Sequence, residues 1–384
     1  MTQLRTKPGY ARMDPAHLFD GLFVPTNGKK RGRLFVAPRD FDGVNIGFQG
    51  FEQLGADDQS ILLALAAQLG IDGLTIDATP PGEISRQLRL LLEFKDKDGN
   101  PLDTGEKLAS RRTSLRSLLI DAGYGNVDSG RALKTARDSL NRLRNAQIRE
   151  RTARGWDRTC NLVSVAFNDI TGEIHVAANP RLTQAVFNGQ HVKVSLFERN
   201  ELESEVAKIL HAWMCSNVRL GQSLGNGNGA HIDTLAPHVW GQATTDASTK
   251  VKSNRRSLLR DALDEIADRT RRLHGGYGWA IDRTASGLVI VSRPKALPPA
   301  EEIFSAPAAL EAASREHSER NFWDSSVAGD EMYRAHGVTP PASKSARTRR
   351  NPKRREGGCK PQAEPRSAED QQWLNDPPRG RELL

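Results

Sequence analysis

The chain has 384 residues, of which 55 are lysine or arginine and 47 are aspartate or glutamate, so that its net charge is +8. This length fits two or three domains, and the basic balance favours a partner that carries phosphates or another anionic surface. Three classes of protein are not indicated. The three cysteines have neither disulfide nor C-x-x-C zinc spacing, which argues against a disulfide framework and a zinc site. The N-terminus does not have the features of a signal peptide, and no stretch approaches the ~20 apolar residues of a membrane span. We therefore expect a soluble, intracellular protein.

The first elements follow from turn residues and apolar spacing. Residues 1–30 are polar and are expected to be flexible, and two strands are expected on either side of a turn at 39–43. A helix should follow, since Asp57 and Asp58 stand at its start, leucines recur at helical spacing, and Gly70 ends it. Residues 71–82 are expected to form a loop, 88–92 a short buried segment, and 108–121 an amphipathic helix.

A helix predicted over residues 128–151 combines an apolar stripe with a cationic face. Ala132, Ala136 and Leu140 recur at a spacing of four, which places them on one side. Between 128 and 154, eight basic residues stand against three acidic ones, and like charges on one helix repel unless an external anion neutralises them. An ordinary solvated surface is the alternative explanation. Strands are expected at 161–167 and 172–177, so that a helix-turn-helix and a hairpin follow one another, as in a winged helix.

The same order recurs further along the chain. Helices are expected at 202–215, 232–240 and 249–272, with a flexible loop at 221–229 and a hairpin of strands at 277–281 and 288–293. In the last of these helices, residues 249–260 hold five basic residues and no acid, and residues 261–268 hold four acids and no basic residue. Cations at a helix N-terminus oppose the helix dipole, so the basic half is expected to meet phosphate or to enter a DNA major groove.

These elements predict an α+β, mainly helical fold of tandem winged-helix domains. The predicted divisions are a flexible N-terminal segment at 1–30, a first winged-helix domain at 31–195, a second at 196–296, and a disordered basic tail at 297–384. The candidate DNA-binding residues on the first basic helix and the strands beside it are Arg131, Lys134, Arg137, Asn141, Arg149 and Arg151. Those on the second basic helix and its hairpin are Lys250, Lys252, Asn254, Arg255, Arg256, Arg260 and Arg293. Asn254 could read adenine, and which of the others contact bases is left open.

Catalytic motifs are not found in the sequence. The glycines at 225–229 lack the spacing of a dinucleotide fingerprint, and the basic patch at 28–33 is not a P-loop. A rolling-circle nickase would need an H-x-H pair that the sequence lacks, and no carboxylate cluster resembles a nuclease or polymerase metal site. We therefore expect no catalytic residue, no metal and no cofactor, and set the enzyme alternative, a nickase or primase, below a DNA-binding protein.

Several segments together resemble one family, RepC, the iteron-binding replication initiator of IncQ-type broad-host-range plasmids. They are DPAH at 14–17, LGADD at 54–58, RQLRLLLE at 86–93, DSGRALK at 128–134, GQHVKVS at 189–195, IDTLAPHVW at 232–240 and SRPKA at 292–296. The resemblance implies tandem winged helices that bind repeated origin sequences (iterons) in double-stranded DNA, open the adjacent A·T-rich DNA and load a plasmid-encoded helicase. It places the protein in the bacterial cytoplasm, with a primase and a homodimer as further partners to consider. The alternative is a winged-helix transcriptional repressor or autoregulator that does not open an origin.

Overall fold

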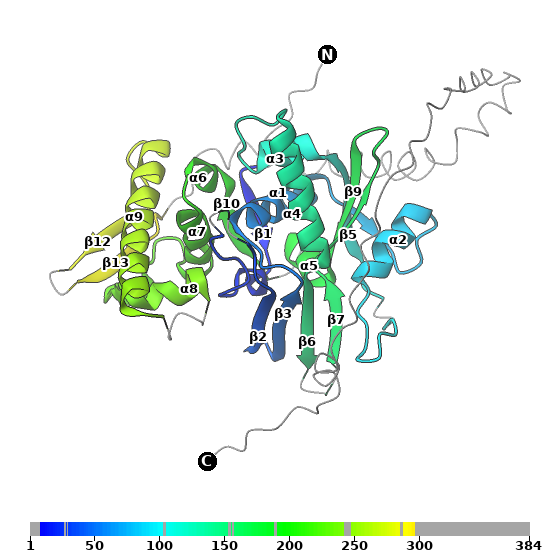
Figure 1. Ribbon diagram of the computed structural model, residues 1–384, viewed down its shortest axis with the longest axis horizontal. Coiled ribbons are helices and arrows are strands. Elements are labelled where there is room, and N and C mark those ends of the chain that lie inside the picture. Colours follow the sequence, from blue (N-terminus) through cyan, green and yellow to red (C-terminus); the bar gives the residue numbers. More distant parts are fainter. Residues whose placement is uncertain are drawn as a thin grey trace, which may run out of the picture. The chain divides into compact units, whose positions relative to one another are not determined.

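The computed structural model describes residues 8–295, apart from residues 27, 29, 103–104, 153–154, 156, 188–189, 242–246 and 285–286 and the side chains of 225–226 (Figure 1). The predicted tail at 297–384 lies outside these residues. Helices and strands both contribute to a mixed α/β fold, and the prediction of a mainly helical chain understates the strands, which form four sheets within the described part. None of the helices described is long and apolar enough to cross a membrane.

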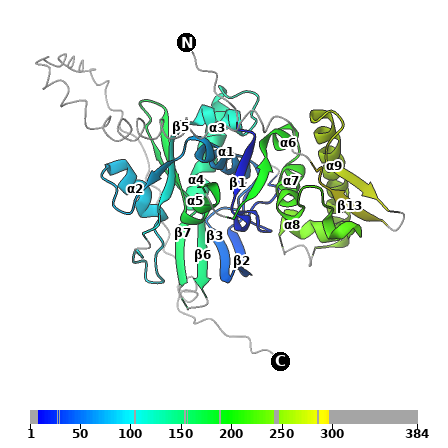
Figure 2. The same cartoon turned by 180° about the vertical axis from the view of Figure 1, so that it is seen from behind.

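The first part of the chain alternates strands and helices. Its elements are β1 (Tyr10–Met13), the 3-10 helix η1 (Pro15–Leu18), β2 (Leu34–Phe41), β3 (Val44–Gly50), α1 (Ala56–Asp72), β4 (Leu74–Ile76), α2 (Glu83–Leu92), β5 (Leu108–Ser114), α3 (Leu115–Asp121), α4 (Gly130–Asn145), β6 (Gln147–Thr152), β7 (Asp157–Asn161), β8 (Val163–Phe167) and β9 (Glu173–Ala178). Antiparallel pairing builds one sheet in the order β2-β3-β6-β7 and another in the order β4-β5-β9-β8. Figures 1 and 2 show the strands of the first sheet side by side.

The second part follows after a short connection. Its elements are α5 (Pro180–Phe187), β10 (Val192–Ser195), α6 (Leu196–Glu201), α7 (Glu205–Asn217), η2 (Leu224–Gly227), β11 (Ala230–His231), η3 (Ile232–Leu235), α8 (Ala236–Trp240), α9 (Thr249–Leu273), β12 (Ala280–Arg283) and β13 (Leu288–Ser292). Strand β10 pairs back with β1, and the last three strands form a sheet in the order β11-β13-β12. Buried side chains from β1 through β13 belong to one hydrophobic cluster, which joins the two parts.

Several sequence-based boundaries are wrong. Residues 10–18, expected in a flexible segment, form β1 and η1 with buried side chains, and residues 39–41, expected in a turn, belong to β2. The helix expected at 108–121 is strand β5 followed by helix α3, because Leu108 and Ala109 are buried in the sheet and the Ser114 hydroxyl caps a helix that starts only at residue 115. The basic helix ends at Asn145, since residues 147–152 alternate buried and exposed side chains as a strand does. Helix α1 continues past Gly70 to Asp72, and the loop expected at 71–82 contains β4.

One connection order occurs twice. In the chain order, a strand leads directly into a short helical segment, a longer helix follows, and two further strands come after it. In the sheet, the three strands pair antiparallel, with the last of them between the other two. In the first instance the sheet order is β5-β9-β8 with α3 and α4, and in the second it is β11-β13-β12 with η3, α8 and α9. A long helix, α1 or α7, precedes each instance. The first instance differs by the extra elements β4 and α2 before it and β6 and β7 within it.

Candidate nucleic-acid interface

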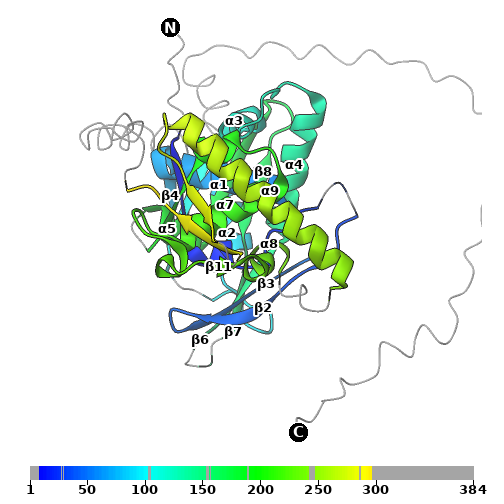
Figure 3. The ribbon, with the colours of Figure 1, turned by 90° about the vertical axis from the view of Figure 1, so that its left-hand side faces the viewer.

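The N-terminal half of α9 extends away from the hydrophobic core. The first buried side chain of this helix belongs to Leu259, ten residues after its start, and Figure 3 shows its N-terminal end reaching past the neighbouring elements. Lys250, Lys252 and Asn254 are exposed here and make no ion pair or side-chain hydrogen bond within the described part of the chain. The Ser248 hydroxyl caps the helix. The feature predicted from sequence, an acid-free cationic helix end, is therefore open to solvent.

The three arginines that follow are placed differently from one another. Arg256 makes a two-bond ion pair with Asp233 of η3, with both nitrogen–oxygen distances at 2.6 Å. The guanidinium of Arg255 lies 5.1 Å from the ring centre of Trp240. Arg260 is exposed. Arg255 and Arg256 thus connect α9 to the helical segment before it, while Arg260 is left available to a ligand.

The acidic residues of α9 make contacts with other elements of the same chain. Asp264 accepts two hydrogen bonds from Arg283 of β12, at 2.7 and 2.8 Å. The carboxylate of Glu265 accepts hydrogen bonds from the backbone amides of Glu203 and Ser204, where α7 begins. These contacts give the acids a structural role and fix the C-terminal half of the helix against its own hairpin and against α7.

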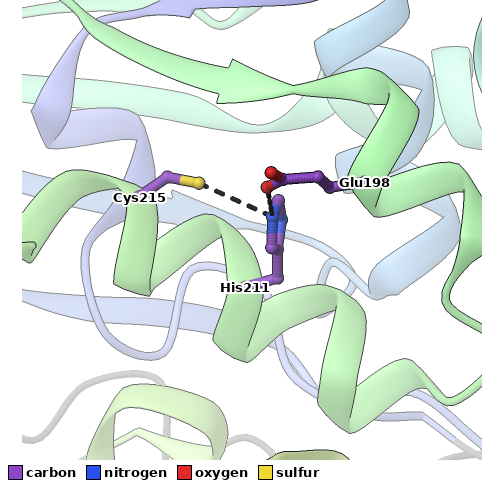
Figure 4. Close-up of side chains that lie close together, drawn as sticks. All are labelled: Glu198, His211 and Cys215. Carbon is purple, nitrogen blue, oxygen red and sulfur yellow. Dashed lines mark hydrogen bonds and ion pairs between the residues drawn. The ribbon is translucent and has the colours of Figure 1, made fainter. Parts of the chain in front are cut away.

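A buried carboxylate, Glu198 of α6, points toward His211 of α7 (Figure 4) and also binds His274 at the end of α9. It accepts hydrogen bonds from the imidazoles of His211 at 2.8 Å and His274 at 3.1 Å, and from the indole of Trp279 at 3.1 Å. Burial alone would raise the pKa of this carboxyl group, but the bonds from His211, His274 and Trp279 outweigh burial and hold the pKa well below its usual range. Glu198 is therefore an ionised residue shared by α6, α7 and the C-terminal end of α9.

The cluster around Glu198 also contains zinc-ligand residue types. Ligand atoms of Glu198, His211 and Cys215 lie within 4.8 Å of one another, and the Cys215 sulfur is 3.7 Å from Nε2 of His211. Because Glu198 already accepts bonds from three separate donors, the arrangement is that of a hydrogen-bonded clamp. Sequence reasoning missed this clamp. His211 and Cys215 share one helix face, but Glu198 and His274 are 76 residues apart, so no local signal connects them.

Helix α4 presents the other cationic face. Arg131, Lys134 and Arg137 are exposed, and Asn141 is half-buried, opposite a buried stripe that includes Leu140. Arg137 pairs with Asp169 at 2.9 Å in the turn of the β8–β9 hairpin, and its guanidinium lies 4.6 Å from the ring centre of Phe167. Arg137 thereby connects α4 to the β8–β9 hairpin, although β6 and β7 of another sheet lie between the two in sequence, where the hairpin was expected to follow the helix directly.

The three remaining candidates do not lie with α4 or α9. Arg149 and Arg151 are on strand β6, exposed on one face of the β2-β3-β6-β7 sheet, where Arg149 is paired with Asp157. Arg293 donates hydrogen bonds to the carbonyl oxygens of Cys215, Val218 and Lys193, at 3.1 to 3.3 Å. Its guanidinium holds backbone segments together. Direct DNA contact by any of the candidates stays a prediction.

Comparison with known proteins adds one match. No curated protein matches the chain in sequence. The family model described as Replication protein C (RepC) matches residues 6–295, which includes every described element and most of the chain. The chain therefore belongs to the RepC family and is a plasmid replication protein.

Proposed function

We propose that this protein is a sequence-specific DNA-binding initiator of plasmid replication built from two winged helices. The repeated connection order supports this architecture, since a strand, two helices and a hairpin with the last strand in the middle of the sheet is the winged-helix order. In this assignment α4 and α9 are the recognition helices, and the β8–β9 and β12–β13 hairpins are the wings.

The exposed N-terminal half of α9 carries the proposal. Lys250, Lys252 and Asn254 project from a helix end that buries no side chain, beside amides that favour phosphate. Recognition helices place these first residues against base edges, and an asparagine can bond adenine through two hydrogen bonds. Lys134 and Arg131 of α4 provide a second set of exposed cations.

Family membership, and the segments that resemble IncQ-type initiators, support the choice of target. We propose that the duplex ligand is the set of directly repeated iterons of the origin. Binding would open the adjacent A·T-rich DNA and recruit a separate plasmid helicase in the bacterial cytoplasm, with a primase acting afterwards. The protein itself would contribute no catalytic group.

A paired substitution tests the α9 assignment. Lys252→Ala combined with Asn254→Ala should weaken binding to an iteron duplex by about tenfold or more, because one good asparagine–adenine contact alone contributes about 1–3 kcal/mol. Fluorescence anisotropy with a labelled duplex measures this. Lys107→Ala, which removes an exposed lysine paired with Asp77 at 3.2 Å, is the matched control and should bind as the parent does.

The same preparation distinguishes initiator from repressor. An initiator should make the A·T-rich strand next to the repeats reactive to permanganate, without hydrolysing ATP. Specific duplex binding with neither strand opening nor helicase recruitment would support the transcriptional repressor instead. Equal binding to iteron and unrelated duplexes would contradict both.

A further inference from the structure

One face of the β2-β3-β6-β7 sheet is open and carries an unusual row of side chains. The strand register places Phe35 opposite Gln49, Gln49 opposite Gln147, and Gln147 opposite Asn161. Residues two apart on a strand share a face, so Phe51, directly after β3, extends the row by one position. We call this surface, Phe35, Phe51, Gln49, Gln147 and Asn161, the aromatic–amide face. The opposite face, with Ile46, Phe48 and Ile148, is buried in the core.

The aromatic–amide face is unlike an ordinary solvated sheet surface. Phe35 is 71% exposed and Phe51 is 82% exposed. Between them and the far edge, the Gln49 amide donates to Gln147 at 3.1 Å, and the Gln147 amide donates to Asn161 at 3.4 Å. These bonds fix the orientation of the Gln49, Gln147 and Asn161 side-chain amides beside the exposed rings of Phe35 and Phe51. Each amide keeps further donor and acceptor capacity for a ligand.

Cations lie near this face. Arg33 is exposed two residues before Phe35, Lys30 is exposed in the segment that leads into β2, and the backbone there is fixed by the bond from the Gln53 backbone amide to the Gly32 carbonyl. Arg151 is exposed further along β6, where the register places it opposite Asp157. None of the three makes an ion pair within the described residues, whereas Arg149 is neutralised by Asp157 and the Asp40 carboxylate accepts a bond from Asn45. Glu52 is the exposed acid beside Phe51.

The free edge of the sheet does not explain the exposed rings. A second copy adding a strand would pair along β2, but β2 carries Pro38, which has no amide proton, and its register shifts between Val36 and Arg39. Both features interrupt edge pairing. A ligand is therefore more easily accommodated on the face than along the edge.

We infer that the aromatic–amide face binds single-stranded DNA. Bases stack on exposed aromatic rings, side-chain amides bond their unpaired edges, and flanking cations bind the phosphates. This inference rests on the proposed function, because origin opening releases such a strand. It assigns Phe35 and Phe51 to a site separate from the duplex-binding helices α4 and α9, so that one protein holds both the closed repeats and a strand freed from the neighbouring DNA.

The test uses the full chain and a labelled oligothymidine of about twenty nucleotides, long enough for a typical single-strand site. Phe35→Ala combined with Phe51→Ala should weaken binding to the oligothymidine by about tenfold or more, since each stacked base contributes strongly. Binding to the iteron duplex should stay unchanged. Leu90→Ala, which removes a 57% exposed leucine from α2, is the control for loss of a surface apolar side chain.

The inference and the proposed function fail in different ways. If the parent protein binds the iteron duplex but not the oligothymidine, or if the double variant binds both as the parent does, the inference is wrong and the initiator assignment stands. Loss of self-association in the double variant, measured by sedimentation with single-strand binding retained, would assign the face to a second copy. Absence of duplex binding by the parent protein would refute the proposed function itself.

Discussion

At the scale of single residues, His17 shows how burial sets a protonation state. Its side chain is fully buried, and Nε2 lies 3.1 Å from the side-chain amide nitrogen of Asn179. The amide donates, so Nε2 accepts and the ring is neutral. Burial lowers the pKa of His17 from 6.5 to about 4, with Asp14 opposing and Arg181 adding to the shift. A neutral histidine inside the fold makes stability depend on pH.

His17 should make the protein less stable in mild acid. Above pH 6.5 the ring is neutral in both states. Below pH 6.5, His17 is protonated in the unfolded chain but stays neutral in the folded chain down to about pH 4. The free energy of unfolding therefore decreases as the pH falls through this range. The loss between pH 7 and pH 5 should be about 2 kcal/mol from this residue. Urea unfolding at both pH values measures it. His17→Gln should reduce the loss of unfolding free energy between pH 7 and pH 5, whereas replacement of the exposed His231 by Gln should not. If the loss is unchanged in His17→Gln, His17 is not its source.

At the scale of elements, the position of α9 depends on its C-terminal half. No side chain of α9 before Leu259 is buried, so the helix is held by Leu259, Leu263 and Ile266 in the core and by the Glu198 clamp near its end. The clamp connects α6 and α7 to the residues on both sides of the turn before β12. A helix that is held rigidly at one end can present its other end to a ligand.

Removing the Glu198 charge should loosen this attachment. Glu198 accepts three hydrogen bonds, whereas the amide of Glu198→Gln carries two protons that would point toward the donors of its neighbours. Breaking such a buried charged network lowers the free energy of unfolding by about 3 kcal/mol. Glu203→Gln is the control. Its carboxylate also pairs with α9, through Arg269, but is 76% exposed, so its loss should cost less than about 1 kcal/mol. Urea denaturation of both variants gives the comparison, and equal losses would show that the clamp does not stabilise the helix.

At the scale of the whole molecule, local patterns in the sequence predicted the elements that carry charge. The buried stripe of α4, the cationic start of α9 and both hairpins follow from spacing between near neighbours. Strand β6 was missed because its alternating Arg149, Glu150 and Arg151 continue a basic helix in composition, and only pairing with β3, about a hundred residues earlier, makes them a strand. The Glu198 clamp and the aromatic–amide face likewise form from residues far apart in sequence, which periodicity cannot connect.

Whether α4 and α9 bind one duplex together is a property of the whole molecule that salt dependence can measure. The slope of log K against log salt is negative, and removing one lysine–phosphate interaction makes it shallower by about 0.9. Lys134 and Lys252 are exposed on different helices and make no ion pair within the described chain. If both helices bind the same DNA, Lys134→Ala and Lys252→Ala should each flatten the slope by about 0.9, and the double variant should flatten it by roughly 1.8. Lys107→Ala should leave it unchanged. If α9 alone binds, Lys134→Ala keeps the parent slope and the double variant matches Lys252→Ala, because a lysine that never meets phosphate releases no counterions.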